Sequence, residues 1–251
     1  MKLGTAVWSE GTSERTALVA ELPSDPSRVV DLNRLEHLRL AKLGEGWAER
    51  MAGAMVPSGL RPLLEGGPRA IHRARQVLAY AEKWQRRGGL PESLAPRVDQ
   101  VRMLACLPRP VALRRWDGSA LDRLALQGPS GTLFGRPVPT LALVGLYGDR
   151  PAGCCLALEH AQGVVLGAWL ELDLDWDGAL EWRLGGQHRR LPLDAWRGLT
   201  LPPLRAAEVL LAPPPRLRLG DGEAGTAIHY VSAFETLTLQ LGDAGVHPTM
   251  Q

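Results

Sequence analysis

The chain is poor in cysteine and in aromatic residues other than tryptophan. Its 251 residues include 3 Cys, 2 Phe and 3 Tyr, against 8 Trp. Three cysteines, Cys106, Cys154 and Cys155, exclude a disulfide framework, and none has the CxxC spacing of a metal site. Because adjacent residues of a strand point to opposite faces, Cys154 and Cys155 are expected to be small buried thiols rather than a bonded pair.

The sequence also lacks an excess of one charge and a long apolar run. Lys and Arg number 29 and Asp and Glu 27, with no long basic segment, which argues against nucleic-acid binding. No window approaches the 18 uncharged apolar residues of a membrane span, and the start MKLGTAVW lacks the apolar segment of a signal peptide. A hydrophobic content of 45% excludes a disordered chain. We therefore expect a folded cytoplasmic protein that binds no membrane.

Residues 1–97 are predicted to form a small α/β module with two helices. The helices are indicated by apolar residues at spacings of three and four, and proline is tolerated at the first position of the second helix. The Gly- and Pro-rich stretch 86–96 predicts a loop or linker, near which the module ends. The expected elements are strands at Lys2–Trp8, Thr16–Leu22 and Arg28–Leu32, a helix from Asn33 and a helix from Pro68.

Residues 98–251 are predicted to form a mostly antiparallel β domain, so the fold class is α+β. Short apolar runs replace the helical spacing, and Gly, Pro and Asp separate them at short intervals. The expected strands include Val98–Leu107, Val138–Leu146, Val164–Leu174 and Ala179–Leu184.

Few residues of the second part indicate chemistry by themselves. The sequence contains none of the motifs GxSxG, HExxH, GxGxxG or the P-loop. His160 could serve as a general base, because imidazole titrates near neutral pH, or it could be a structural histidine. On a strand, Glu171, Asp173, Asp175 and Asp177 would share one face. They would then form either a site for a hard cation or a solvated edge that deters strand pairing.

The order of segments resembles the N-terminal region of the fumarylacetoacetate hydrolase superfamily. A strand module and a helix precede LRPLLEGGPRAIHRARQVLAYAE (60–82), which is followed by VDQVRMLACLPRP (98–110) and LRRW (113–116). The resemblance covers about the first 115 residues well and the remainder weakly. It implies that the core resembles that family's β roll and that the protein is a homodimer. It also implies an enzyme acting on a small-molecule carbonyl ligand, normally with a divalent metal.

The metal-binding carboxylates of that family are absent at the matching positions. In that family two glutamates in an ExE motif bind the metal, and the matching residues here are Val138 and Thr140. The third metal ligand corresponds to Trp169. The catalytic histidine would lie near Asp122, and no histidine occurs between His72 and His160. Because Val and Trp offer no hard oxygen donor, we expect no metal and no other cofactor. The alternative is a metal site relocated to Glu159, Glu171 and Asp173.

The resemblance leads to one leading hypothesis and two alternatives. The first is a metal-independent cyclase, isomerase or lyase of specialised metabolism that acts on an enolisable carbonyl compound in a drier, more aromatic pocket. The alternatives are an inactive relative that binds a ligand or a partner subunit, and a metal-dependent hydrolase or decarboxylase with relocated ligands. The candidate catalytic residues are Arg114, Arg115, Asp122, His160 and His229. The candidate substrate-binding residues are Trp116, Val138, Thr140, Trp169 and Tyr230.

Overall fold

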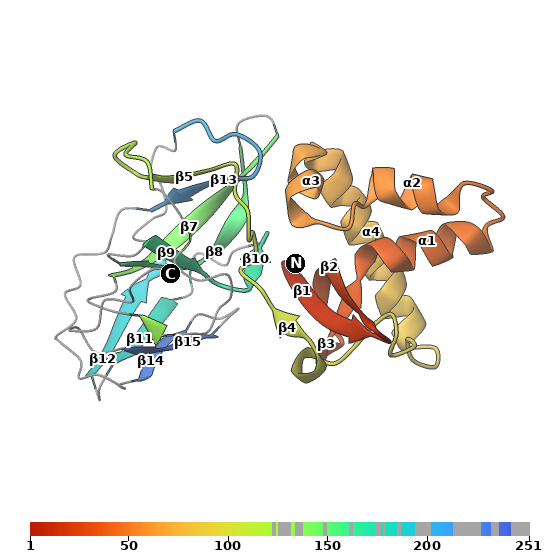
Figure 1. Ribbon diagram of the computed structural model, residues 1–251, viewed down its shortest axis with the longest axis horizontal. Coiled ribbons are helices and arrows are strands. Elements are labelled where there is room, and N and C mark those ends of the chain that lie inside the picture. Colours follow the sequence, from red (N-terminus) through yellow and green to blue (C-terminus); the bar gives the residue numbers. More distant parts are fainter. Residues whose placement is uncertain are drawn as a thin grey trace.

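A computed structural model gives the arrangement of the chain (Figure 1). It describes residues 1–121, 124, 132–133, 138–147, 150–160, 163–173, 177, 179–184, 187–193, 202–212, 227–231 and 236–241. The elements of the first part are β1 (Lys2–Glu10), β2 (Ser13–Leu22), β3 (Asp25–Asp31), α1 (Leu32–Lys42), α2 (Ala48–Met55), α3 (Leu60–Glu65) and α4 (Gly67–Gln85).

The second part consists mainly of strands in the described ranges, as predicted. A short 3-10 helix, η1 (Val98–Gln100), leads into it. Its strands are β4 (Arg102–Met103), β5 (Ala112–Arg115), β6 (Thr132–Leu133), β7 (Val138–Leu146), β8 (Arg150–His160), β9 (Gly163–Leu166), β10 (Trp169–Glu171), β11 (Ala179–Leu184), β12 (Gln187–Pro192), β13 (Glu208–Leu211), β14 (Ala227–Val231) and β15 (Thr236–Leu241).

One sheet of ten strands runs through both parts of the molecule. Its order is β3-β2-β1-β10-β8-β7-β13-β5, with β4 also paired to β1 and β9 to β8. A second sheet has the order β12-β11-β14-β15-β6. Only the pairs β13–β5 and β15–β6 are parallel among the described strands. The mixed α+β class with a mostly antiparallel core is therefore confirmed.

The N-terminal part contains four helices where the sequence predicted two. The helix expected from Asn33 is divided into α1 and α2, because the chain turns at Gly44, which has a φ of 83°. Leu43 and Trp47 fit the apolar spacing of one continuous helix, yet they lie in this turn with 65% and 68% of their surfaces exposed. The second predicted helix is α4, with Pro68 in its first turn, and α3 is an additional short helix before it.

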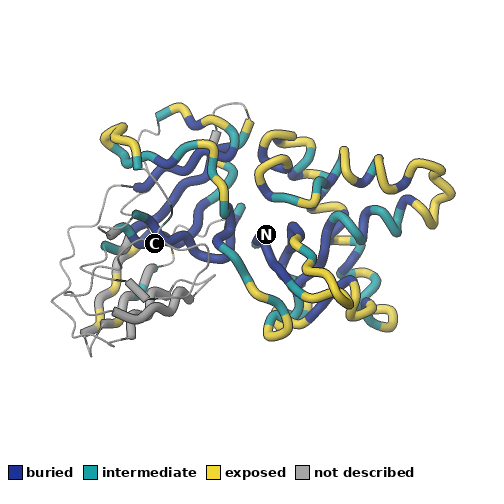
Figure 2. Tube along the Cα trace, viewed as in Figure 1, coloured by how far each residue is buried: buried dark blue, intermediate teal, exposed yellow. Residues whose placement is uncertain are grey.

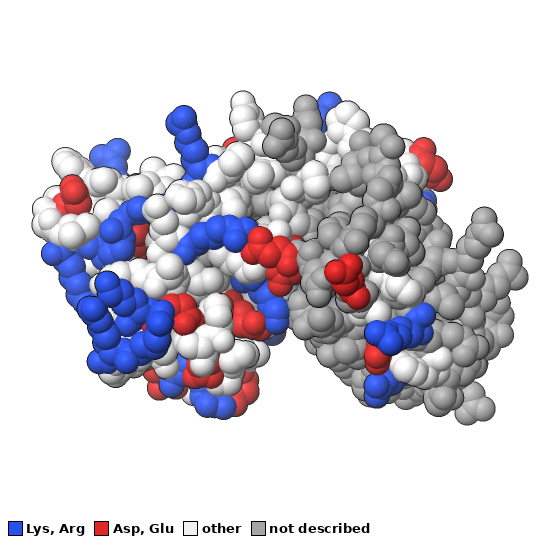
Figure 3. Space-filling view, turned by 180° about the vertical axis from the view of Figure 1, so that it is seen from behind, with Lys and Arg blue, Asp and Glu red and all other residues white. Residues whose placement is uncertain are grey.

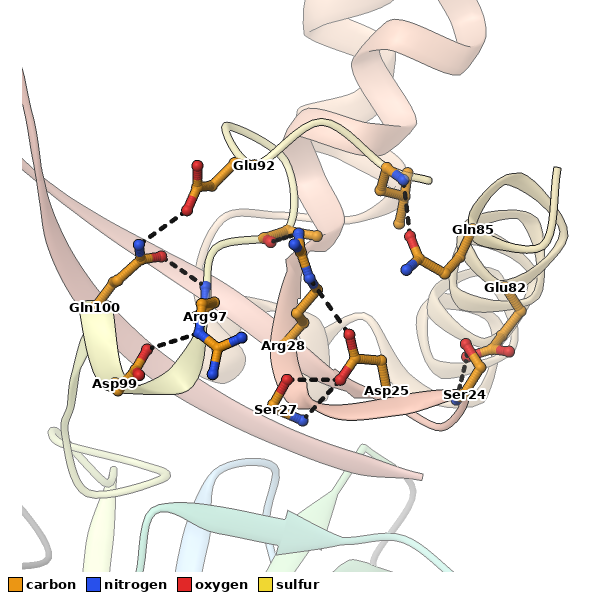
Figure 4. A network of polar contacts seen from close by, with 12 residues as sticks. Ser24, Asp25, Ser27, Arg28, Glu82, Gln85, Glu92, Arg97, Asp99 and Gln100 are labelled. Carbon is orange, nitrogen blue, oxygen red and sulfur yellow. Dashed lines mark hydrogen bonds and ion pairs between the residues drawn. The ribbon is translucent and has the colours of Figure 1, made fainter. Parts of the chain in front are cut away.

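The segment 86–96, expected to be a loop or linker, is a loop whose end is hydrogen-bonded to β3. The backbone amide of Val29 donates to the carbonyl of Pro96 at 3.0 Å, and that of Asp31 donates to Leu94 at 3.0 Å. Side chains add to this attachment: Arg28 donates to the carbonyl of Ala95 at 3.0 Å and also contacts Asp25. Figure 4 shows the contact of Arg28 with Asp25 beside the Ser24–Glu82 and Glu92–Gln100 hydrogen bonds. The end of the segment thus lies along the outer edge of β3.

A continuous apolar core lies on one face of the large sheet. Figure 2 shows buried residues following the sheet through both parts of the molecule. In the N-terminal part the helices cover this face, and Leu18, Leu64 and Val77 are fully buried there. The same cluster extends to Ala157 and Val209 of the second part. The side chains of Cys106, Cys154 and Cys155 are buried, as predicted.

Several predicted strands of the second part agree with the structure, and others are divided. The expected bounds of Val138–Leu146 and Ala179–Leu184 coincide with β7 and β11. The run Val98–Leu107 contains η1 and the two-residue β4 instead of one strand, and Val164–Leu174 is divided into β9 and β10. The 11-residue β8 was not predicted. Within the described residues, no helix is long and apolar enough to cross a membrane.

Charged side chains of both signs lie on the surface of the N-terminal part. In the rear view of Figure 3, a group of Lys and Arg side chains lies at the left edge, with Asp and Glu side chains between it and the second part. Charge on this face is therefore mixed.

Candidate functional site

The candidate site begins at β5, an edge strand that carries two adjacent arginines. β5 runs parallel to β13, with Arg114 opposite Leu210 and Arg115 opposite Leu211. Successive side chains of a strand point to opposite faces, so Arg115 shares a face with Leu113, which belongs to the main core. Arg114 lies on the other face.

After β5 the chain turns back beside this strand, and the amide of Leu121 donates to the carbonyl of Leu113 at 2.8 Å. The turn is closed by the amide of Arg115, which donates to the carbonyl of Ser119 at 2.9 Å, and Gly118 adopts a φ of 86°. Leu121 and Leu124 then pack against the main core. Leu124 forms a parallel bridge with Val164 of β9. The described residues of this segment therefore contact both β5 and β9.

An ion pair joins the end of β5 to β8. Arg115 Nε donates to Glu159 Oε1 at 2.5 Å, and Nη1 donates to Ser119 Oγ at 3.3 Å. The side chain of Arg115 is 41% exposed and that of Glu159 is 23% exposed. The pair thus combines a cation and a carboxylate that both remain accessible to a small molecule.

Two of the predicted substrate-binding residues lie directly beside this pair. Val138 of β7 is the register partner of Glu159, and Thr140 is the partner of Ala157. Paired residues of antiparallel strands share a face, so Val138, Thr140 and Glu159 lie on one surface. Thr140 is buried, and its hydroxyl donates to the carbonyl of Ala212 at 2.8 Å. The structure therefore brings Arg115, Val138 and Thr140 together.

Arg114 takes part in a separate cluster on the opposite face. Its Nε lies 2.5 Å from Oε1 of the buried Glu208, and its Nη2 donates to the carbonyl of Pro203 at 3.1 Å. The second oxygen of Glu208 accepts a hydrogen bond from the amide of Arg205 at 2.9 Å. These contacts anchor the segment before β13 to β5. Trp116 follows β5 in the turn and is half-buried.

Trp169 does not join the surface formed by Val138 and Thr140. It lies opposite Gly4 of β1 and packs with Ala6 and Val19 in a separate cluster. The next residue, Leu170, belongs to the main core, so Trp169 points to the other face of its strand. Its large ring fills the junction between β10 and β1.

The three residues of the relocated metal site are not brought together either. Glu171 pairs with Cys154 of β8, five positions before Glu159, which corresponds to about 17 Å along a strand. Glu171 and Asp173 instead accept hydrogen bonds from the amino group of Met1 at 2.8 and 2.9 Å. The alternating acidic run is interrupted as well, because β10 ends at Glu171. Asp177 lies in a turn, and Asp175 is outside the described residues.

Asp173 has a second cationic partner on α4. Arg75 donates to both carboxylate oxygens of Asp173, at 2.8 and 2.9 Å. The Arg75 guanidinium, followed by the Met1 amino group, lowers the pKa of Asp173 from 3.8 to about 2. Asp173 is therefore a charged link between α4 and the second part of the molecule.

Four remaining candidates cannot be placed at side-chain level. Asp122 lies outside the described residues. His160 is the last residue of β8, and His229 and Tyr230 belong to β14, but the described structure covers only their backbone. His229 and Tyr230 are paired with Arg183 and Trp182 of β11 in the second sheet.

Sequence reasoning missed the carboxylate partners of the two arginines. Glu159 was considered only as a relocated metal ligand, and Glu208 was not considered. Alternation along β8, had that strand been predicted, would have placed Glu159 on the same face as Ala157. No local signal connects Arg115 with a residue 44 positions later.

The described residues at the implied metal position do not fit a divalent cation. Such an ion needs several hard oxygen ligands. Val138 supplies none, Trp169 faces elsewhere, and the nearby carboxylate of Glu159 is paired with Arg115. Among the described residues, no group of three His, Cys, Asp or Glu side chains is arranged to hold a metal ion.

Comparison with known proteins supports the fold through solved structures. No protein-family model matches the chain, and no curated protein sequence matches it. A 2-hydroxyhepta-2,4-diene-1,7-dioate isomerase from Mycobacterium marinum has a TM-score of 0.51 and 13% identity, with 98% of this chain and 100% of that chain covered. A 5-carboxymethyl-2-hydroxymuconate delta-isomerase from Mycobacterium smegmatis has a TM-score of 0.53 and 14% identity, with 96% and 99% covered.

A third similar structure belongs to a dehydratase. It is 2-keto-3-deoxy-D-arabinonate dehydratase complexed with magnesium and 2,5-dioxopentanoate, with a TM-score of 0.54, 8% identity, and 96% of this chain and 99% of that chain covered. At such low identity these similarities establish the fold. They extend over nearly the whole chain, including the part where the sequence resemblance was weak. The chain therefore has the fold of the fumarylacetoacetate hydrolase superfamily, as its first 115 residues predicted.

Proposed function

We propose that this protein is an enzyme that transfers a proton from one carbon atom to another in an enolisable carbonyl compound, without a divalent metal. The observation that carries the proposal is the accessible Arg115–Glu159 pair on the surface formed by Val138 and Thr140. A guanidinium and a carboxylate stand where the resemblance implies a cation and its ligands. An isomerase fits this pair best, and a lyase or cyclase would share the first step.

Arg115 would supply the positive charge for the reacting oxygen. A guanidinium presents several N–H donors in a fixed plane, and Nε is the atom bound to Glu159. Its other donors could bind the carbonyl oxygen of a substrate. In the partly dry site, donors held in place stabilise the negative charge that develops on that oxygen.

Glu159 would act as the base. Its carboxylate would accept a proton from the carbon next to the carbonyl, and the electrons of that C–H bond would form the C=C bond of an enolate. Return of the same proton to another carbon of the conjugated system would restore the carbonyl and complete an isomerisation. No atom or electron is gained or lost in this sequence.

The remaining candidates complete the proposal. Val138 and Trp116 would contact the apolar part of the substrate, and the fixed hydroxyl of Thr140 would limit the depth of the site. Asp122, His160, His229 and Tyr230 stay candidates for proton transfer and substrate contact. Two similar structures are named isomerases and one a dehydratase, and these activities support proton movement beside a carbonyl. The dehydratase was solved with magnesium, so the proposed chemistry departs from that neighbour.

Deuterium exchange tests the proposal without knowledge of the natural substrate. The purified protein would be incubated with 2-oxobutanoate and with acetylacetone in deuterated buffer containing EDTA, and loss of the proton signals would be followed by NMR. We expect exchange above the buffer rate for at least one probe. We also expect Glu159→Gln and Arg115→Gln to reduce it to the buffer rate, because each removes one half of the pair.

A matched variant separates the site from general effects of charge. Glu92→Gln changes an exposed carboxylate that binds Gln100 far from the pair, and it should exchange as the unmodified protein does. The proposal is overturned if neither probe exchanges, if both site variants keep full activity, or if exchange requires added Mg²⁺. The last result would support the metal-dependent alternative.

A further inference from the structure

A hollow of about 450 Å³ lies on the N-terminal part of the molecule. It is formed by the β1–β2 pair, the start of α3 and the segment between β4 and β5. None of its residues belongs to the Arg115–Glu159 site. It is lined by Thr5, Thr16, Gly59, Leu60, Arg61, Pro62, Leu104, Leu107, Pro108 and Arg109, and is called here the Arg61–Arg109 hollow.

Backbone hydrogen bonds hold the walls of this hollow in place. The amide of Leu18 donates to the carbonyl of Ser58 at 2.7 Å and fixes the chain before α3 to β2. The amide of Leu104 donates to the carbonyl of Thr5 at 2.9 Å, and the Thr5 hydroxyl donates to Cys106 at 3.0 Å. Both walls are thus attached to the same pair of strands, so the hollow is built before any ligand arrives.

The polar groups of the hollow favour an anion. Arg61 and Arg109 are both exposed, and none of the lining residues is acidic. Arg61 Nε contacts Glu65 at 2.9 Å, in a pair that is about half exposed on both sides. Arg109 has no ion-pair partner among the described residues. Two guanidinium groups can each donate charge-assisted hydrogen bonds to a carboxylate.

The strand pair adds two hydroxyl-bearing side chains. Thr5 pairs with Leu18 and Thr16 pairs with Val7, so Thr5 and Thr16 lie on the same face of β1 and β2. Thr16 is exposed and therefore accessible to a ligand, whereas Thr5 is buried.

The rest of the lining is apolar. Leu60, Leu104 and Leu107 contribute aliphatic side chains, and Pro62 and Pro108 border them. The volume lies within the range of roughly 300–1,000 Å³ that is usual for small-molecule sites. We propose that the Arg61–Arg109 hollow binds a small organic acid. Its carboxylate lies between the two guanidinium groups, and its short apolar chain lies against the leucines.

Titration with hexanoate tests this assignment. The full-length protein with labelled leucine methyl groups would be titrated with hexanoate, and with hexanamide as the uncharged analogue, while NMR shifts are recorded. We expect saturable shifts of Leu104 and Leu107 with hexanoate, at least tenfold weaker binding of hexanamide, and weaker hexanoate binding at high salt. Arg61→Gln and Arg109→Gln should each weaken hexanoate binding about tenfold.

Two further variants make the result specific. Arg87→Gln removes an exposed arginine after α4 and should leave hexanoate binding unchanged. Arg115→Gln should also leave the Leu104 and Leu107 shifts unchanged, whether or not the proposed enzyme function is correct. The inference is overturned if these shifts disappear in Arg115→Gln, if hexanamide binds as well as hexanoate, or if both Arg61→Gln and Arg109→Gln bind normally.

Discussion

The N-terminal and second halves of the molecule use the same kind of ion pair for different purposes. In the N-terminal half, Glu36 is completely buried and contacts Arg39 and Arg73, so the pair joins α1 to α4. In the second half, Arg115 and Glu159 are paired but partly exposed. The difference in burial therefore distinguishes an ion pair that holds two helices together from one that is accessible to a ligand. The following predictions test this difference.

The largest expected effect is on chemistry in the second half. Glu159→Gln should slow proton exchange by a factor of roughly 100 to 10,000, because a positioned general base contributes this much. Its free energy of unfolding should change by less than about 1 kcal/mol, since the pair is partly exposed. NMR exchange rates and urea unfolding would measure the two quantities. A large loss of stability with normal exchange would show that this pair is structural.

The corresponding change in the N-terminal half should have the opposite profile. Glu36→Ala should lower the free energy of unfolding by about 3 kcal/mol, because it leaves Arg39 and Arg73 facing each other without a counter-charge. Exchange activity of the folded protein should remain normal. Glu92→Ala is the control and should stay within about 0.5 kcal/mol in urea unfolding. Equal stability of the two variants would contradict the structural role of Glu36.

Within the second half, the close approach of β8 and β10 should be sensitive to added volume. A Cβ at Gly153 would lie 2.2 Å from the carbonyl oxygen of Glu171, a backbone atom that cannot rotate away. Gly153→Ala should therefore cost about 2 kcal/mol or more in the free energy of unfolding. Gly46→Ala serves as the control, because no atom lies within 4 Å of its Cβ position. Equal urea midpoints for the two variants would refute the close approach of β8 and β10.

The smallest effect concerns the charged link from α4. Asp173 has a folded pKa of about 2, below the usual value, so its contribution is present above about pH 4 and is lost as the pH falls towards 2. Asp173→Asn should lower stability by about 1 kcal/mol or less, because more than half of the side chain is exposed. The difference from the unmodified protein should shrink between pH 4 and pH 2 in thermal unfolding. A constant difference would exclude titration of Asp173 as its origin.

The sequence predicted elements where one local signal dominated. β7 and β11 were predicted with their observed bounds, since apolar or alternating runs end at Gly or Pro. The prediction of a single helix from Asn33 was wrong, because Leu43 and Trp47 have the spacing of a buried helix face although both are exposed. β8 was missed, since its start, Arg-Pro-Ala-Gly, has the composition of a turn.

The candidate site was predictable only in part for a related reason. Arg115, Val138 and Thr140 were chosen from the resemblance, and the structure brings them together. Their partner Glu159 was not assigned to Arg115, because the two residues are 44 positions apart and meet only through the arrangement of β5 and β8. Trp169 was placed by alignment alone, and the alternation along β10 turns it towards β1. The direction of a side chain thus determines whether an aligned residue belongs to the site, and its position in the sequence alone does not.

The pairing of β1 with β10 has a consequence for how the chain folds. Lys2 pairs with Glu171 and Gly4 with Trp169, so this edge of β1 can find its partner only after most of the chain has been synthesised. Until then β1 can pair with β2 and β4 but presents open backbone groups towards the missing strand. Contacts of such long sequence separation slow folding and prolong the exposure of strand edges. The pairing of β1 is therefore completed only once the chain up to Glu171 is available.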